Sequence, residues 1–156
     1  MDLLMDHAEK AADTFSQGLN CAQSVFSSFS EELGLDEKTA KKIAGCFGSG
    51  MRCGEVCGAL TGALMAIGLK YGACSAEDTE EKADTNTKTV EMINAFKAEN
   101  GSIFCRDLLG YDILKENELA IIREKGLFKT ICPKLVGSAA LILEKKLDEW
   151  EAGSRK

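Results

Sequence analysis

The sequence contains few residues of several chemically important types: one histidine, one proline and one tryptophan among 156 residues. Because His7 is the sole histidine and falls on a predicted helix of ordinary pattern, we expect neither an imidazole–metal site nor a Cys–His dyad. The 25 acidic residues are scattered along the chain and form no recognisable catalytic pair. With a single proline, the 15 glycines supply nearly all the breaks between elements. Catalytic motifs that depend on histidine or on paired carboxylates are therefore absent from the sequence.

Positive charge is in the minority, and long apolar runs are missing. The 19 basic and 25 acidic residues give a formal net charge of −6, which favours solubility and argues against binding to nucleic-acid phosphates. The longest apolar run, residues 56–69, is broken by glycines and is shorter than the roughly 20 residues of a membrane span. Residues 1–6 include two acids where a secretory signal would be basic. We therefore predict a cytoplasmic protein that binds neither nucleic acid nor membranes.

Helical periodicity runs through the sequence, and no segment alternates polar and apolar residues for long enough to predict a strand. The length of 156 residues fits one domain and is sufficient to bury a hydrophobic core. We predict an all-α, single-domain bundle of about six or seven helices, covering residues 1–156, around a buried central helix at about residues 55–71. The predicted helices are 3–17, 21–33, 36–44, 55–71, 75–99, a short helix capped by Ser102, and a last helix that follows Pro133.

Local signals define several of these helix ends. Asn20 is a predicted N-cap, and Gln23 stands three residues later, as in a capping box. Residues 45–54 are rich in glycine and are predicted to form a flexible loop, whose Gly-Ser-Gly sequence lacks the lysine of a phosphate-binding loop. The helix at 55–71 is apolar nearly all round, which is typical of a buried element. Its many glycines and alanines should allow neighbouring helices to approach closely.

Cysteine is unusually frequent. The seven cysteines are Cys21, Cys46, Cys53, Cys57, Cys74, Cys105 and Cys132. In a reducing compartment a static disulfide framework is not expected, and the odd number agrees with that view. We therefore interpret the cysteines as metal ligands or as redox-active thiols. Cys46 and Cys74 fall in the glycine-rich loop and in a linker, and both are predicted to be peripheral.

Four cysteines share one structural position, the start of a predicted helix. Cys21 follows the N-cap Asn20, Cys57 and Cys105 fall in first turns, and Cys132 precedes a proline that suits a first helical position. Free N–H groups and the positive end of the helix dipole stabilise a thiolate there. Such placement can lower the pKa of a thiol from about 8.5 into the range of roughly 3.5–7.5. A thiolate both attacks disulfides and binds metals, so the pattern is compatible with either chemistry.

Cys53 and Cys57 form a C-x3-C pair, which is neither the spacing of thioredoxin-like motifs nor that of a haem-attachment site. If both residues were helical, they would share a face and would suit joint metal ligation better than a disulfide. If Cys53 lies in the preceding loop, a disulfide between them becomes possible.

Five short motifs stand out together: residues 20–23 (Asn-Cys-Ala-Gln), 47–51 (Phe-Gly-Ser-Gly-Met), 57–62 (Cys-Gly-Ala-Leu-Thr-Gly), 105–108 (Cys-Arg-Asp-Leu) and Cys132. In combination they resemble the family called C_GCAxxG_C_C, whose members are described as redox-active. The resemblance covers about residues 10–145. It implies that Cys21, Cys57, Cys105 and Cys132 are the characteristic cysteines, with Cys53 as a fifth candidate. A related domain in split-Soret cytochromes extends the implication to an iron–sulfur cluster, although this chain lacks their haem-binding motifs.

Three hypotheses follow. In the first, the protein carries out thiol–disulfide or electron-transfer chemistry with a redox partner, and Cys57 acts with Cys53 or Cys21 as the attacking and resolving thiols. In the second, Cys21, Cys57, Cys105 and Cys132 bind an iron–sulfur cluster or another metal. In the third, the chain is a helical interaction module, and replacing these four cysteines would leave its activity in the cell intact. We expect a homodimer; the sequence names no substrate.

Overall fold

A computed structural model describes residues 6–154 of the chain, and it confirms the all-α prediction. Within these residues there is no strand, and the one element of β-structure is an isolated bridge between Val56 and Phe104. The helices, with η for short turns of other pitch, are α1 (His7–Ser16), α2 (Cys21–Ser30), η1 (Glu31–Leu33), α3 (Glu37–Ile43), η2 (Ala44–Cys46), η3 (Gly50–Gly54), α4 (Gly58–Tyr71), α5 (Thr79–Asn100), α6 (Cys105–Leu109), α7 (Glu116–Lys125), α8 (Leu127–Thr130) and α9 (Cys132–Ser154).

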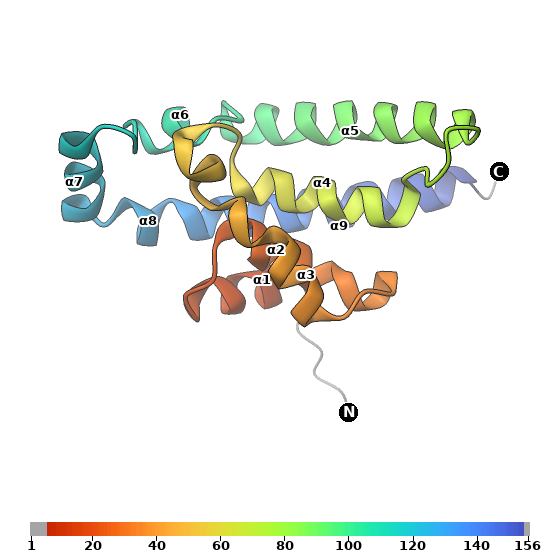
Figure 1. Ribbon diagram of the computed structural model, residues 1–156, viewed down its shortest axis with the longest axis horizontal. Helices are drawn as coiled ribbons and strands as arrows, with labels where there is room; N and C mark the ends of the chain where they lie inside the picture. The colour runs from red at the N-terminus through yellow and green to blue at the C-terminus, as the bar shows by residue number, and fades with distance from the viewer. Residues whose placement is uncertain (1–5, 155–156) are drawn as a thin grey trace.

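The long helices α4, α5 and α9 run side by side along the molecule and contact one another (Figure 1). α1, α2 and α3 pack on one side of this layer, where α2 contacts α4 and α1 contacts α9. The short helices α6, α7 and α8 lie at the end of the molecule where α4 and α9 begin (Figure 1). That end therefore brings together the first turns of helices that are far apart in the sequence.

Side-chain caps define the first two helices. Asp6 accepts a hydrogen bond from the backbone N–H of Glu9 at 2.8 Å, so α1 begins at His7. Residues 3–5, with which the first predicted helix begins, lie outside the described residues. At α2 the Asn20 side chain accepts from the N–H of Gln23 at 2.8 Å, and the Gln23 side chain accepts from the N–H of Asn20 at 2.9 Å. The predicted capping box is confirmed.

The central helix, α4, begins at Gly58 and not at residue 55 as predicted. Residues 55–57 are extended and lie antiparallel to residues 103–105 at the Val56–Phe104 bridge. The N–H of Cys57 donates to the carbonyl of Ile103 at 2.7 Å, and the N–H of Cys105 donates to the carbonyl of Glu55 at 2.6 Å. Because these long-range hydrogen bonds hold the segment extended, Cys57 is the N-cap of α4 and does not lie in its first turn.

Glycine allows α2 to approach α4 very closely. A Cβ atom added to Gly62 would lie 2.6 Å from the carbonyl oxygen of Ala22, and one added to Gly58 would lie 3.2 Å from the Cβ of Cys21. Both distances are shorter than an ordinary van der Waals contact. The prediction that small residues in this helix permit close packing is therefore confirmed, and the contact sets the position of Cys21 against α4.

We predict opposite effects for alanine at two glycines of α4. Gly62→Ala should lower the free energy of unfolding by about 1–3 kcal/mol, since its methyl group would collide with backbone atoms of α2. The methyl group of Gly68→Ala would meet no atom within 4 Å. This substitution should raise the free energy of unfolding by about 0.4–1 kcal/mol, because alanine reduces the entropy of the unfolded chain. Urea unfolding measures both. Equal effects of the two substitutions would contradict the close packing of α2 on α4.

No single helix of residues 6–154 is both long and apolar enough to cross a membrane. Glu116–Lys125 and Leu127–Gly153 reach that length and composition only when taken together, and they are bent by 53° at the break between them.

Candidate functional site

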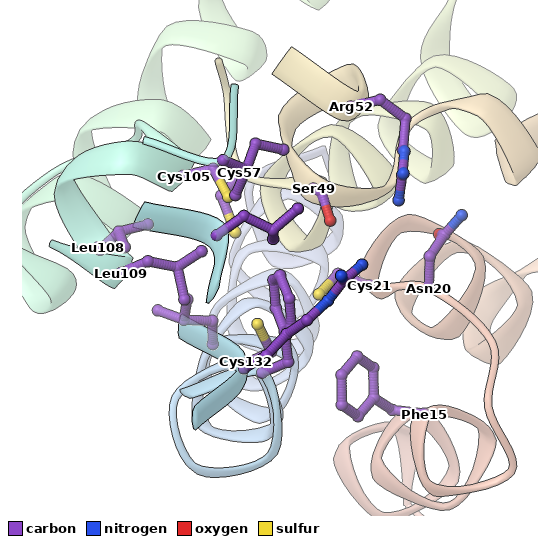
Figure 2. Close-up of a pocket in the computed structure, with 16 residues that line it drawn as sticks. Phe15, Asn20, Cys21, Ser49, Arg52, Cys57, Cys105, Leu108, Leu109 and Cys132 are labelled. Carbon is purple, nitrogen blue, oxygen red and sulfur yellow. The ribbon is translucent and has the colours of Figure 1, made fainter. Parts of the chain in front are cut away.

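The four cysteines that begin or cap helices line a single pocket with a volume of ≈ 280 Å³ (Figure 2). Cys21, Cys105 and Cys132 are the first residues of α2, α6 and α9, and Cys57 caps α4. All four are buried: Cys57 is 3% exposed, and the other three are 7–8% exposed. Four segments that are distant in the sequence thus contribute one sulfur atom each to the same cavity, as the sequence predicts.

The isolated bridge positions Cys57 and Cys105. In an antiparallel pair centred on Val56 and Phe104, residues 57 and 105 lie diagonally on one face, within reach of one another. An ion pair fastens the same two segments: Arg106 contacts Glu55 at 2.7 Å and also donates to the carbonyl of Gly54 at 3.2 Å. The first turn of α6 is therefore held against the start of α4 by backbone and side-chain bonds together.

Cys132 reaches the pocket after a bend of 53° between α7 and the helical segment that follows it. Gly126, with φ 66°, ends α7 in the left-handed conformation and starts α8. Ile131 separates α8 from α9, and α9 begins at Cys132 with Pro133 in its first turn, where the missing proline N–H costs no hydrogen bond. Cys132 therefore occupies the leading end of the longest helix, whose dipole favours a negative charge there.

Cys21 and Cys132 form a directly interacting pair. The thiol of Cys21 donates a hydrogen bond to the sulfur of Cys132, and this bond lowers the pKa of Cys132 even though burial acts in the opposite direction. The same bond raises the pKa of Cys21 well above that of an ordinary thiol. Burial adds to the effect, as does the negative charge of each of the other three sulfurs when that sulfur is ionised. Cys132 therefore ionises first, while Cys21 keeps its proton.

The prediction that a helix start lowers the pKa of a thiol is wrong for Cys57 and Cys105, as it is for Cys21. The first-turn N–H groups of Ala59 and Leu60 do lower the pKa of Cys57, but burial outweighs them and raises it to about 11. Burial raises the pKa of Cys105 to about 12, and negative charge on Cys57 or Cys132, when either is ionised, acts in the same direction. Both side chains are neutral thiols at neutral pH.

The remaining cysteines do not line the pocket. Cys53 is half-buried outside α4, and its thiol donates to the carbonyl of Gly50 at 3.3 Å. Cys53 and Cys57 therefore do not share a helical face, and a catalytic role for Cys53 stays a prediction. Cys46 and Cys74 are exposed.

The glycine-rich loop forms a defined left-handed turn. Ser49, Met51 and Arg52 have φ values of 53°, 59° and 61°, and Gly50 between them has φ 61°. Residues other than glycine rarely adopt this backbone conformation, which costs them roughly 1–2 kcal/mol each. Gly50 is required, since a Cβ there would lie 2.4 Å from the backbone nitrogen of Glu55. The turn places Ser49 and Arg52 at the pocket (Figure 2).

Sequence reasoning missed the non-cysteine residues of the pocket. Two arginines, Arg52 and Arg123, line it together with Asn20, Ser49 and apolar side chains that include Phe15 and Leu109. Arg123 lies on α7, a helix that the sequence analysis did not predict, and no local pattern marks it as a pocket residue. The Gly-Ser-Gly sequence before Arg52 was the one available signal of an unusual backbone.

No group of three or more His, Cys, Asp or Glu side chains within residues 6–154 is arranged so that it could hold a metal ion. The predicted ligation of a metal or cluster by Cys21, Cys57, Cys105 and Cys132 stays a prediction.

Comparison with known families agrees with the motifs and with the pocket. The family model described as "Putative redox-active protein (C_GCAxxG_C_C)" matches residues 19–146, which is most of the chain. The chain belongs to the C_GCAxxG_C_C family. In this C_GCAxxG_C_C protein the matched range contains all four pocket cysteines. No curated protein and no solved structure matches the chain.

Proposed function

We propose that this C_GCAxxG_C_C protein is a thiol–disulfide redox protein in which Cys132 attacks a disulfide and Cys21 resolves the intermediate. The observation that supports it best is that Cys21 and Cys132 lie buried in one pocket, where their direct interaction lowers the pKa of Cys132 and raises that of Cys21. A thiolate beside a protonated thiol is the arrangement that disulfide exchange requires, because the two sulfurs act in sequence.

In the first step the Cys132 thiolate attacks one sulfur of a substrate disulfide. The substrate S–S bond breaks, a bond forms between the Cys132 sulfur and the attacked sulfur, and the other half of the substrate leaves as a thiolate that takes a proton from solvent. The pocket suits this step, since burial among mostly apolar side chains limits the contact of the reacting sulfurs with water.

The second step needs Cys21 to ionise. Once Cys132 is in the mixed disulfide, its sulfur carries no negative charge and accepts a weaker hydrogen bond, so the two influences of Cys132 that raise the pKa of Cys21 are relieved. Cys21 then loses its proton and attacks the Cys132 sulfur. The mixed disulfide breaks, the Cys21–Cys132 bond forms, and the second substrate thiol leaves with a proton. Two electrons have passed from the protein to the substrate, and of the two protons that the products carry, one comes from Cys21 and the other from solvent.

A metal or iron–sulfur site is the second candidate. The observation that favours it is that the pocket holds four thiols, two more than one exchange reaction needs. Because the described side chains are not arranged to hold a metal ion, the four sulfurs would have to move closer together on binding it. Four cysteine thiolates are the usual ligands of such clusters and of structural zinc. This function would require the raised pKa values of Cys21, Cys57 and Cys105 to be overcome by the bound metal, because only thiolates bind it.

One anaerobic preparation separates the two candidates. The reduced protein is treated with one equivalent of the uncharged bis(2-hydroxyethyl) disulfide, free thiols are counted, and the new bridge is located by peptide mapping. We expect two thiols to be lost per chain, two equivalents of 2-mercaptoethanol to appear, and the bridge to join Cys21 to Cys132. Iron or zinc in stoichiometric amounts in the untreated sample, with four thiols protected, would instead support the metal site. Thiols that do not react in a metal-free sample would contradict both.

A further inference from the structure

The wall of the cysteine pocket carries a charge opposite to that of the protein. The chain has a formal net charge of −6. Among the described residues that line the pocket, however, Arg52 and Arg123 are the charged ones, and none is an aspartate or a glutamate. A concave surface with charge of one sign concentrates ligands of the opposite sign. The pocket is thus a local site for anions on a protein that otherwise repels them.

The two guanidinium groups are not engaged in the structure of residues 6–154. Of the arginines described there, Arg106 pairs with Glu55, whereas neither Arg52 nor Arg123 forms an ion pair or a side-chain hydrogen bond. The two arginines do not set the ionisation of the four thiols. The pKa values of these thiols depend on burial, on the other sulfurs of the pocket and on hydrogen bonds. Both side chains are exposed, so their donors are available to a ligand at the pocket.

The backbone that presents Arg52 is a second, independent observation. Ser49, Met51 and Arg52 all adopt left-handed conformations that are unfavourable for their side chains. Strain of this kind persists where the surrounding structure maintains it, and it concentrates at functional sites. Here it turns Arg52 toward the pocket beside Ser49 and Asn20, on the side where Cys21 lies (Figure 2).

We infer that the substrate of this pocket is a small anionic disulfide whose carboxylate group is bound by Arg52 and Arg123 while its sulfur atoms face Cys132 and Cys21. This inference rests on the proposed thiol–disulfide function and names the substrate class. Arginine is suited to the role because its planar fork of donors matches a carboxylate. A small molecule fits better than a protein segment, since the four cysteine residues are only 3–8% exposed and line a cavity of ≈ 280 Å³. The apolar part of the wall would contact the carbon chain of the ligand.

Three symmetric disulfides of similar size test the inference: 3,3′-dithiodipropionate with two carboxylates, bis(2-hydroxyethyl) disulfide without charge, and cystamine with two ammonium groups. The rate at which each oxidises the reduced protein is divided by its rate with dithiothreitol, which removes differences in intrinsic reactivity. We expect the normalised rate for dithiodipropionate to exceed that for the uncharged compound about tenfold, with cystamine slowest. The preference should fall at high salt, because both arginines are exposed.

Matched variants locate the effect. The double variant Arg52→Gln/Arg123→Gln should abolish the preference for the dianion. Lys145→Gln removes one positive charge from an exposed residue of α9 outside the pocket, and this variant should retain the preference. Equal normalised rates for the three disulfides, or a preference that survives in the double variant, would overturn the inference and leave the exchange reaction standing.

Binding of suberate distinguishes failure of the inference from failure of the proposed function. Suberate is a dicarboxylate whose chain has the same length as that of dithiodipropionate, with methylene groups in place of the sulfurs, and it cannot react with thiols. We expect calorimetry to detect its binding to the reduced protein and a roughly tenfold weaker affinity in the double arginine variant. Binding of suberate to a protein whose thiols react with no disulfide would support the anion site and contradict the exchange function. Absence of binding would overturn the anion site.

Discussion

Replacing Cys132 by serine is expected to reduce turnover of a disulfide substrate to the rate of the protein-free blank. Serine keeps the size and the hydrogen-bonding capacity of the side chain, but its hydroxyl does not ionise near neutral pH and cannot form the mixed disulfide. The burial of Cys132 and its place at the first turn of α9 are unchanged by so small a substitution. Release of thiol from bis(2-hydroxyethyl) disulfide, with dithiothreitol as the regenerating reductant, measures the effect.

Cys74→Ser is the control for this variant. Cys74 is exposed and does not line the pocket, so its removal should leave turnover unchanged. Urea unfolding of both variants tests whether a lost rate reflects a lost fold. Turnover by a folded Cys132→Ser variant at the wild-type rate would contradict the assignment of Cys132 as the attacking thiol, and Cys57 would then become the candidate.

The partner variant, Cys21→Ser, should behave differently. It retains the attacking thiol but lacks the sulfur that releases the substrate, so the mixed disulfide should accumulate. Mass spectrometry should then show each chain heavier by one half of the disulfide, attached to Cys132. A mixed disulfide on Cys21 in the Cys132→Ser protein, with none on Cys132 in the Cys21→Ser protein, would reverse the two roles.

The fold could be predicted wherever the signals are local. The capping box of Asn20 and Gln23 lies within four consecutive residues, and the structure confirms it. The start of α4 could not be predicted from neighbouring residues, because it depends on hydrogen bonds between residues 55–57 and residues 103–105. α7 was missed since its ten residues are mostly polar and Ile122 is its one buried side chain, which leaves too little periodicity to indicate a helix.

At the candidate site, too, local patterns could be predicted from the sequence, and long-range contacts could not. Placement at helix starts selected Cys21, Cys57, Cys105 and Cys132, and the structure brings these four together. The sequence alone does not indicate which two of the four cysteines interact directly. Spacing drew attention to Cys53 beside Cys57, whereas the hydrogen-bonded pair is Cys21 with Cys132, which meet only through tertiary packing.

The pKa values of the thiols also could not be predicted from neighbouring residues. A helix start lowers the pKa of a cysteine only if its effect exceeds the cost of burial. At Cys57 burial prevails, and at Cys132 the hydrogen bond from Cys21 prevails. The site therefore depends on one thiol being activated by another, and this dependence can be measured.

Removing the thiol of Cys21 is expected to shift the reactivity of Cys132 to higher pH. The donated hydrogen bond favours the charged form of Cys132 and holds its pKa down, so Cys21→Ala should raise that pKa by leaving the thiolate without its donor. The thiolate fraction at a fixed neutral pH then falls, and alkylation by iodoacetamide slows in proportion. Rates measured between pH 5 and 10, with the label at Cys132 quantified by mass spectrometry, give the half-point of the curve for each variant.

Cys21→Ser is the matched control, because a serine hydroxyl can donate to the Cys132 sulfur where alanine cannot. We expect the half-point in the serine variant to remain close to that of the wild type and the half-point in the alanine variant to lie above both. The comparison separates hydrogen bonding from the charge of Cys21, since neither replacement can ionise in this range. If serine and alanine shift the curve equally, the donated proton does not control Cys132, and the helix dipole of α9 becomes the remaining source of its low pKa.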